Sequence, residues 1–434
     1  MTQHFRRSLA RLWHLLRADR LAMVFCIAIC AGTPGLGAAN SPSFAPFQIL
    51  PMGSPPQAVA IADLDGDSRM DLVSVTQFSF DPSSSYKLFV YFQNPDGTLA
   101  SPMKQDSGNG ISVAVGDVNG DGVADLVTTF DDAIGVRYGL GGRLFGPMLK
   151  LPFSSLIEQV QVADLNGDGR QDIVVLDQAS ANIVVFYQNP SGAMGPGAYI
   201  PAPHAGGNDL KIADMNGDGR LDVVISSTLA ASGQQITLVV QRADGTFDPP
   251  TFLPYAFGPF APWGIGLVDI DGNGARDIVA TQAWNVPEAR LIVLFNQGLL
   301  FATTELVPSY EGPAPVQIGD INLDGISDVV VVHNGFFHAG VYTRRATGGL
   351  DAEVLFTIPD SYPGRQGVAI GDLNGDRRPD LAIVGPTGLT ILYNMTPFPP
   401  MAAAIQVPVF TPFGLLVLVL AMMGVYWVAL RLRG

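Results

Sequence analysis

Residues 164–176 read DLNGDGRQDIVVL: a nine-residue segment with oxygen-bearing side chains at positions 1, 3, 5 and 9, followed directly by a β-branched apolar run. We call this segment an Asp loop. The pattern D-x-[DN]-x-[DN]-x-x-x-D occurs seven times, and the copies begin at Asp63, Asp117, Asp164, Asp214, Asp269, Asp320 and Asp372. Their spacings are 54, 47, 50, 55, 51 and 52 residues. A period of about fifty residues is typical of propeller blades rather than of helical solenoids.

Each unit contains four short apolar or alternating segments of the kind that form strands. In the first unit they cover 58–62, 72–76, 88–92 and 99–104. The turn between the third and fourth segments is Asp-Gly at 96–97 and 244–245 and Ser-Gly at 191–192. Such hairpin turns favour a positive φ at the glycine, so the sequence predicts tight antiparallel hairpins here.

The strand count predicts how the ring closes. After the seventh Asp loop only two segments remain, 381–384 and 389–394, whereas 44–50 precedes the first unit without a partner. If this N-terminal strand completes the last blade, the body 40–394 holds 28 strands in seven blades of four. We therefore predict an all-β, seven-bladed β-propeller with four strands per blade, closed by its N-terminal strand, which removes exposed sheet edges.

Composition excludes several other classes. The 434 residues include 49 Gly and 33 Pro, too many for a helical bundle, and 47% hydrophobic residues, too many for a wholly disordered chain. The net charge of −15 argues against a nucleic-acid partner. Both cysteines, Cys26 and Cys30, lie in the first forty residues, so the body has neither a disulfide nor a cysteine metal site.

The Asp loops have the chemistry of calcium sites. Oxygen-only ligands with several carboxylates suit a hard cation with six or seven irregular contacts, which favours Ca²⁺ over Mg²⁺. Residues 40–394 hold 38 acidic and 17 basic side chains, a net charge of −21 that up to seven Ca²⁺ ions would reduce to about −7. The predicted metal ligands are Asp63, Asp65, Asp67, Asp71, Asp117, Asn119, Asp121, Asp125, Asp164, Asn166, Asp168, Asp172, Asp214, Asn216, Asp218, Asp222, Asp269, Asp271, Asn273, Asp277, Asp320, Asn322, Asp324, Asp328, Asp372, Asn374, Asp376 and Asp380.

These loops have two other interpretations. An EF-hand needs a bidentate glutamate at position 12, and no copy has one there. A metal-free turn rich in Asp and Asn is the remaining alternative, although seven complete copies at one period favour ion binding. Leu323 at position 4 of the sixth loop and Arg377 at position 6 of the seventh replace the usual glycine, so these two sites are expected to bind more weakly.

The loops, with the strand patterns LFVYFQN at 88–94 and IVVFYQN at 183–189, resemble the FG-GAP/VCBS repeat family, which includes the propeller of integrin α-subunits. The resemblance covers about 350 residues. It implies Ca²⁺ loops between the first and second strands of each blade, all on one face of a seven-bladed ring. It also implies a role in adhesion, surface display or carbohydrate binding, although some members of the family carry enzymes.

The opposite face would hold the remaining connections, which are rich in aromatic residues. Such side chains can stack on sugars or anchor a protein partner. The ligand-face candidates are Tyr255, Trp263, Trp284, Phe336 and Phe337. Packing of these loops is the plainer alternative. We predict a glycan- or protein-binding module; no catalytic residue is assigned, and a polysaccharide lyase or hydrolase, with His333 as a candidate, is the alternative.

The two ends of the chain carry targeting features. Residues 1–39 contain five arginines, then an apolar stretch and a small-residue segment ending at Ala39, the order of a secretory signal peptide. A retained membrane anchor is the alternative. Residues 413–430 are uncharged and just long enough to span a bilayer as a helix, and Arg431 and Arg433 follow them. We assign 395–412 to a Pro-rich linker with a sorting motif and 413–434 to a transmembrane or sorting tail.

The segment VPVFTPFG at 407–414, followed by the apolar run and basic end, resembles the IPTL-type C-terminal sorting signals of Gram-negative bacteria. It departs from the core motif at Val407 and Phe410, where Ile and Leu are usual. The resemblance implies an exported protein at the cell surface, in the outer membrane or outside the cell. Anchoring by a C-terminal membrane helix is the alternative.

Overall fold

The computed structural model describes residues 40–77, 83, 86–130, 133–153, 156–177, 182–203, 207–227, 235–253, 262–282, 287–359, 364 and 366–399. The predicted signal peptide 1–39, the tail 413–434, Tyr255 and Trp284 lie outside these residues. Within the described part of the chain, no helix is long and apolar enough to cross a membrane.

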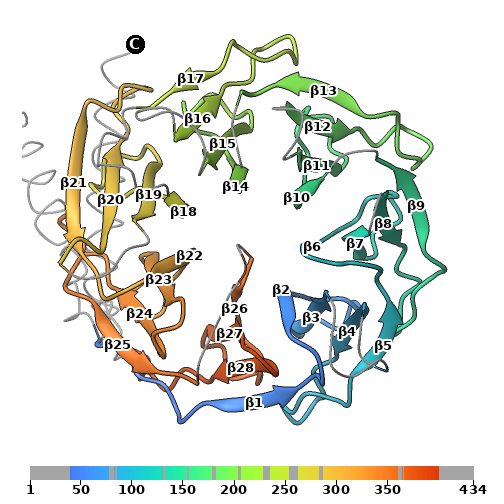
Figure 1. The fold of residues 1–434 in the computed structure, drawn as a ribbon, viewed down its shortest axis with the longest axis horizontal. Helices are drawn as coiled ribbons and strands as arrows, with labels where there is room; N and C mark the ends of the chain where they lie inside the picture. The colour runs from blue at the N-terminus through green and yellow to red at the C-terminus, as the bar shows by residue number, and fades with distance from the viewer. Residues whose placement is uncertain are drawn as a thin grey trace, which may run out of the picture. The chain divides into compact units, whose positions relative to one another are not determined.

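The described residues form seven four-stranded antiparallel sheets that are arranged as blades in a ring (Figure 1). The innermost strands, which number the blades one to seven, are β2 (Pro56–Ala62), β6 (Val113–Gly116), β10 (Ile157–Ala163), β14 (Gly207–Ala213), β18 (Pro262–Val268), β22 (Pro313–Gly319) and β26 (Val368–Gly371). The second strands are β3 (Asp71–Thr76), β7 (Asp125–Phe130), β11 (Asp172–Asp177), β15 (Asp222–Ser227), β19 (Asp277–Gln282), β23 (Asp328–His333) and β27 (Asp380–Val384).

The third strands are β4 (Lys87–Tyr91), β8 (Ala133–Arg137), β12 (Asn182–Phe186), β16 (Ile236–Val239), β20 (Arg290–Phe295), β24 (His338–Tyr342) and β28 (Gly388–Leu392). The outer strands are β5 (Met103–Asp106), β9 (Leu149–Pro152), β13 (Ala198–Pro201), β17 (Thr251–Phe252), β21 (Thr303–Pro308), β25 (Val354–Thr357) and, for blade seven, β1 (Gln48–Pro51). The predicted fold is therefore confirmed.

The N-terminal strand closes the ring as the strand count predicts. β1 pairs antiparallel with β28, so blade seven has the order β1-β28-β27-β26. The contact continues beyond the strands: the N–H of Ser43 donates to Thr396 Oγ1 at 3.0 Å, and the N–H of Met395 donates to the carbonyl of Ser43 at 2.7 Å. The first and last described strands thus share one sheet.

The core lies between the blades. Buried apolar side chains form seven clusters, each shared by two neighbouring blades; Leu72 of blade one and Ile391 of blade seven, for example, belong to the same cluster. The second strands are buried along almost their whole length because both faces of each sheet are covered. This explains their continuous apolar runs.

One predicted strand is displaced. The sequence suggests a fourth strand at 99–104, whereas β5 begins at Met103. Leu99 forms only an isolated bridge with Gln93, and the regular pairing starts one residue out of that register, at Val90 with Met103. The same offset separates the Arg344–Leu350 bridge of blade six from the Val341–Val354 pair, where Glu353 takes the place of Pro102, so the interruption does not depend on the proline.

Candidate functional site: the Asp loops

Each Asp loop joins the first and second strands of a blade, so all seven lie on one face of the ring. Position 2 of each loop is a fully buried apolar residue, such as Leu165 or Ile270, which anchors the loop to the core. The glycines at positions 4 and 6 adopt positive φ. Leu323 (φ 63°) and Arg377 (φ 66°) adopt the same left-handed conformation, so both loops keep the common shape.

The last residue of each loop is an aspartate that begins the second strand and is completely buried. In loop three, Asp172 Oδ2 accepts the backbone N–H of Leu165 at 3.0 Å, and Oδ1 accepts that of Gln188 at 2.9 Å. All seven blades repeat this pair of bonds, from position 2 and from a residue just beyond the third strand. Position 9 therefore fastens the loop to the third strand, a structural role that the sequence analysis missed.

Burial has a strong effect on these carboxyl groups. Loss of hydration raises the pKa of Asp172 to about 6 and that of Asp380 to about 7, while the backbone N–H bonds act in the opposite direction. The neighbouring loop aspartates raise the pKa further through like-charge repulsion. A cation bound beside such a group would favour its ionised form.

The first aspartate of each loop curls back onto the loop backbone. Asp63 Oδ1 accepts the N–H of Gly66 at 2.8 Å and that of Asp67 at 3.1 Å, and Oδ2 accepts the N–H of Ser68 at 2.8 Å. This is the hydrogen bonding that the metal-free alternative expects. A carboxylate has about four lone-pair sites, so these bonds leave capacity for a cation.

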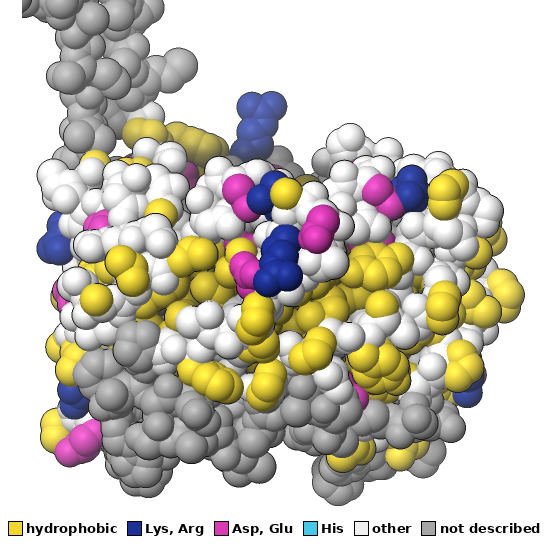
Figure 2. Space-filling model, turned by 90° about the horizontal axis from the view of Figure 1, so that it is seen from above, with side chains coloured by type: hydrophobic (Ala, Val, Ile, Leu, Met, Phe, Trp, Pro, Cys, Tyr) yellow, Lys and Arg dark blue, Asp and Glu magenta, His cyan; other side chains and the backbone are white. Residues whose placement is uncertain are grey.

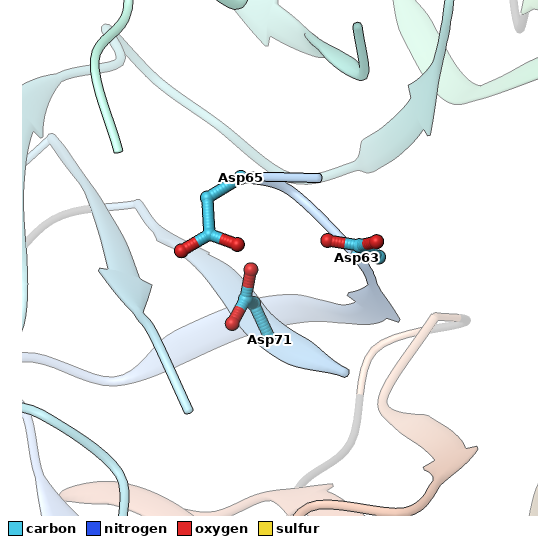
Figure 3. Close-up of side chains that lie close together, drawn as sticks. All are labelled: Asp63, Asp65 and Asp71. Atoms are coloured by element: carbon cyan, nitrogen blue, oxygen red, sulfur yellow. The ribbon is translucent and has the colours of Figure 1, made fainter. Parts of the chain in front are cut away.

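Positions 1, 3 and 9 converge. In loop one, carboxylate oxygens of Asp63, Asp65 and Asp71 lie within 4.8 Å of one another, and Figure 3 shows the three side chains facing a common space. Loop five repeats the cluster with Asp269, Asp271 and Asp277. The other five loops carry asparagine at position 3. Two ligands at about 2.4 Å from one Ca²⁺ can be at most about 4.8 Å apart, so this oxygen-only set fits the ion.

Position 5 has a second partner. In four loops its aspartate forms an ion pair with the arginine two residues later: Asp67 with Arg69, Asp168 with Arg170, Asp218 with Arg220, and Asp376 with Arg378. The sequence analysis assigned position 5 only as a metal ligand and did not identify this ion pair. The recurrence of arginine at position 7 in four of seven copies was the available signal.

A ring of side-chain donors connects each loop to the next blade. The residue just beyond the third strand, whose N–H binds position 9 of its own blade, also reaches back to the preceding loop. Asn296 Nδ2 donates to the carbonyl of Met215 at 2.6 Å, and Asn394 Nδ2 to that of Ile321 at 2.9 Å. Gln93, Gln188, Gln241 and Arg344 make equivalent bonds, and Arg143 bridges blades one and two. The loops are thus parts of the blade interfaces.

The aromatic candidates lie at the opposite ends of the blades. Trp263 is the second residue of β18 rather than a loop residue, and 39% of it is exposed. Phe337, in the turn between β23 and β24, is 51% exposed, whereas Phe336 is half-buried. The ring of Phe336 lies 6.4 Å from that of Tyr310. Phe336 therefore packs against its neighbours, whereas Phe337 faces solvent.

His333, the candidate of the enzyme alternative, is completely buried. Its Nδ1 lies 2.9 Å from the carbonyl of Glu311 and its Nε2 lies 2.8 Å from Glu353 Oε1. The second Glu353 oxygen accepts the N–H of Tyr310 at 2.8 Å. Gly340 leaves the space through which the Glu353 side chain passes, because a Cβ there would lie 1.9 Å from Oε1. This network ties the link between blades five and six to blade six.

Three segments, 63–128, 164–225 and 320–383, match the family model of the FG-GAP-like repeat. Each begins at the first aspartate of an Asp loop and ends in the second strand of the following blade. Together the matched segments make up 192 of the 434 residues. The matched FG-GAP-like units are therefore offset from the blades, because each one includes the interface between two blades. No curated protein matches the chain significantly.

Several solved structures have a similar fold. An Agrocybe aegerita lectin that recognises non-reducing terminal N-acetylglucosamine is 18% identical, with a TM-score of 0.55 over 79% of this chain and 86% of the lectin. BBS1N, solved in complex with ARL6DN, is 13% identical (TM-score 0.53; 83% and 98% covered). Catalytically inactive virginiamycin B lyase from Staphylococcus aureus, with quinupristin, is also 13% identical (0.52; 81% and 99%). At sequence identities of 13–18%, these similarities show a common fold only.

Proposed function

We propose that this chain is an exported, calcium-stabilised β-propeller that acts as a surface-displayed binding or adhesion module for a glycan or a protein. The observation that carries the proposal is the separation of two kinds of surface. One face holds seven carboxylate loops built into the blade interfaces, and the other presents exposed aromatic side chains on adjacent blades. The propeller fold and the matches to FG-GAP-like repeats support this proposal.

In this proposal the calcium ions are structural. Positions 1, 3 and 9 would hold the ion in each loop, with position 5 as a further oxygen donor where its arginine permits. The bound ion supplies positive charge that offsets repulsion among carboxylates. Because position 9 also fastens the third strand, an ion in the loop would stabilise the blade as a whole.

Ligand binding is assigned to the aromatic face of blades five and six, where Trp263 and Phe337 are exposed. Large aromatic rings bury much area and lose little conformational entropy, so they serve well as anchors. Other exposed apolar residues are distributed along the rim of the ring, including Tyr199 (61% exposed) and Phe252 (40%). Figure 2 shows the rim on the side of β13 and β17, with hydrophobic and charged side chains interspersed.

A second surface competes for this assignment. A cavity of about 740 Å³ lies on the Asp-loop face among loops four, five and six, with Asp214, Asp269 and Arg276 in its lining. Its volume is in the range of small-ligand sites. The binding experiment below therefore includes a variant on each face.

We propose binding rather than catalysis as the activity. Both ring nitrogens of His333 face protein acceptors and the side chain is closed to solvent, which does not suit a general base acting on a polysaccharide. The hydrolase or lyase alternative would need other residues.

The test is a glycan-array and surface-protein screen with the full chain in calcium. We expect Trp263→Ala and Phe337→Ala each to weaken binding of the selected ligand by about 1–3 kcal/mol, and the matched exposed aromatic Tyr199→Ala to leave it unchanged. Loss of binding in Arg276→Gln, with Trp263→Ala unaffected, would transfer the site to the Asp-loop face. Failure to bind any glycan or protein would instead favour a purely structural envelope role.

Export is proposed from the chain ends. Secretion predicts that the chain, expressed in a Gram-negative host, is recovered outside the cytoplasm with a mature N-terminus that follows Ala39. Mass spectrometry of the purified protein reads this terminus directly. A cytoplasmic product that retains Met1 would contradict export.

A further inference from the structure

The seven Asp loops differ in the guanidinium groups that contact their carboxylates. Loops three, four and seven pair with the arginine at their own position 7. Loop one has this arginine and a second, Arg143, from blade two. Loop five has Ala275 at position 7 but is approached by Arg344 of blade six. In loops two and six, position 7 is Val123 or Ile326, and no ion pair reaches their aspartates within the described residues.

The contact of Arg143 is built from several directions. Its Nε donates to Asp65 Oδ2 at 2.8 Å, and Nη2 donates to the carbonyl of Gln93 at 3.0 Å and lies 4.0 Å from Asp67 Oδ2. The guanidinium lies over the ring of Phe92, 5.0 Å from its centre. The side chain of Asp65 is only 5% exposed and that of Arg143 is 35% exposed, so the carboxylate of this ion pair is largely shielded from water while the guanidinium is partly hydrated.

The position of Arg143 also has a structural reason. At the other six interfaces the residue beyond the third strand bridges to the preceding loop. In blade two this residue is Gly139, and a Cβ there would lie 2.3 Å from the carbonyl oxygen of Ala124. With no side chain available at that point, Arg143, from the following turn, supplies the bridge between blades one and two.

Arg344 is held by its own blade and reaches the neighbouring one. Its backbone N–H donates to Asp328 Oδ1 at 3.0 Å. Its side chain donates through Nε to the carbonyl of Ile270 at 3.3 Å and places Nη2 3.7 Å from Asp269 Oδ2. The side chain of Arg344 is 14% exposed, so this contact is also partly shielded.

Counting these arginines separates the loops into two classes. Loop one has four aspartates with Arg69 and Arg143, which leaves a formal −2, and loops three and four have three aspartates and one arginine each, which also leaves −2. Loops five and seven keep −1, because Arg276 and Arg377 lie within them in addition to the paired Arg344 and Arg378. Loops two and six have three aspartates and no paired arginine, which leaves −3. Repulsion in the absence of an ion is therefore greatest in loops two and six.

We propose that Arg143 and Arg344 act as resident cations that keep loops one and five folded without calcium, and that loops two and six are those whose order depends most on the ion. The proposal rests on the calcium binding proposed above. If an arginine stabilises the calcium-free loop more than the calcium-bound loop, it lowers the affinity of that loop for calcium by the same free energy, because folding and binding are linked. Calcium removal would then open the ring at two places rather than uniformly.

Hydrogen exchange followed by mass spectrometry tests this on the full wild-type chain, first saturated with calcium and then in excess chelator. We expect exchange in peptides covering 117–125 and 320–328 to accelerate by about tenfold or more on chelation, and in 63–71 and 269–277 by no more than about threefold. Equal acceleration in all four segments would overturn the inference. No change in any loop would refute calcium binding itself.

Arg143→Gln provides the causal test. In chelator, exchange in 63–71 should rise to the level of loop two, and calcium should restore protection. The control is Arg242→Gln, which removes an arginine whose partner, Asp248, is exposed and lies outside the Asp loops. If Arg143→Gln raises exchange no more than Arg242→Gln does, Arg143 is not a resident cation.

Discussion

Asp172→Asn tests the structural role of position 9. The substitution preserves side-chain size but replaces one accepting oxygen by an NH₂ group, which then faces a backbone N–H. Either the N–H of Leu165 or that of Gln188 loses its charge-assisted acceptor in a fully buried place. Loss of a hydrogen bond to a charged acceptor lowers the free energy of unfolding by about 1.5–3 kcal/mol. The buried backbone N–H that is left without an acceptor lowers it further. Relief of the buried charge offsets part of this, so we expect a net loss of about 2–4 kcal/mol.

Asp168→Asn is the matched control in the same loop. The chemical change is identical, but the Asp168 side chain is 29% exposed and its ion partner is Arg170. A partly exposed pair of this kind contributes about 0–1 kcal/mol. Both residues are predicted calcium ligands, so calcium binding alone does not distinguish them.

The assay is urea unfolding of the full chain followed by circular dichroism, in excess chelator and in saturating calcium. We expect Asp172→Asn to lower the unfolding midpoint well below that of Asp168→Asn in chelator, where neither residue acts as a ligand. Equal midpoints in chelator would refute the argument that position 9 fastens the loop to the third strand.

Three further outcomes are expected. Deleting 43–50 should lower the melting temperature and cause association, because it removes the strand that closes blade seven; a monomeric variant with wild-type stability would show another mode of closure. Gly192→Ala should destabilise more than Gly169→Ala: both glycines have positive φ, but only at Gly192 would a Cβ clash, 2.2 Å from a carbonyl of the preceding loop. In chelator, the free energy of unfolding should fall as the pH rises from about 4 to 7. The reason is that burial raises the pKa of Asp380 to about 7, so the folded state keeps this proton to a higher pH than the unfolded state does. Unfolding midpoints that rise over this pH range would contradict the prediction.

The repeat pattern predicts the ring because one unit occurs seven times and the strand count leaves a single arrangement for the N-terminal strand. The positions of the Asp loops follow from the same pattern. The start of β5 does not, because the pairing shifts by one residue between the Gln93–Leu99 bridge and the regular ladder, and alternation of side chains does not reveal such a shift. Trp263 was expected in a loop because the aromatic residues before it suggest one, yet it lies in β18.

The contacts between blades could not be predicted from the repeat pattern, for a different reason. Arg143 meets Asp65 across 78 positions, and Asn296 meets Met215 across 81, so neither pair is visible as a local motif. The second role of position 9 was equally hidden, because an aspartate that binds an ion and one that accepts two backbone N–H groups have the same place in the loop. Repeated amides beyond the third strand were the only sequence signal of this network.

Calcium analysis of the purified full chain, combined with calorimetry, tests the central claim most directly. The account predicts bound calcium in the untreated protein, several ions per chain and at most seven. Chelation should lower the melting temperature by many degrees, and added Ca²⁺ should restore it better than equimolar Mg²⁺. A protein that contains no calcium and melts at the same temperature in excess chelator would contradict the account.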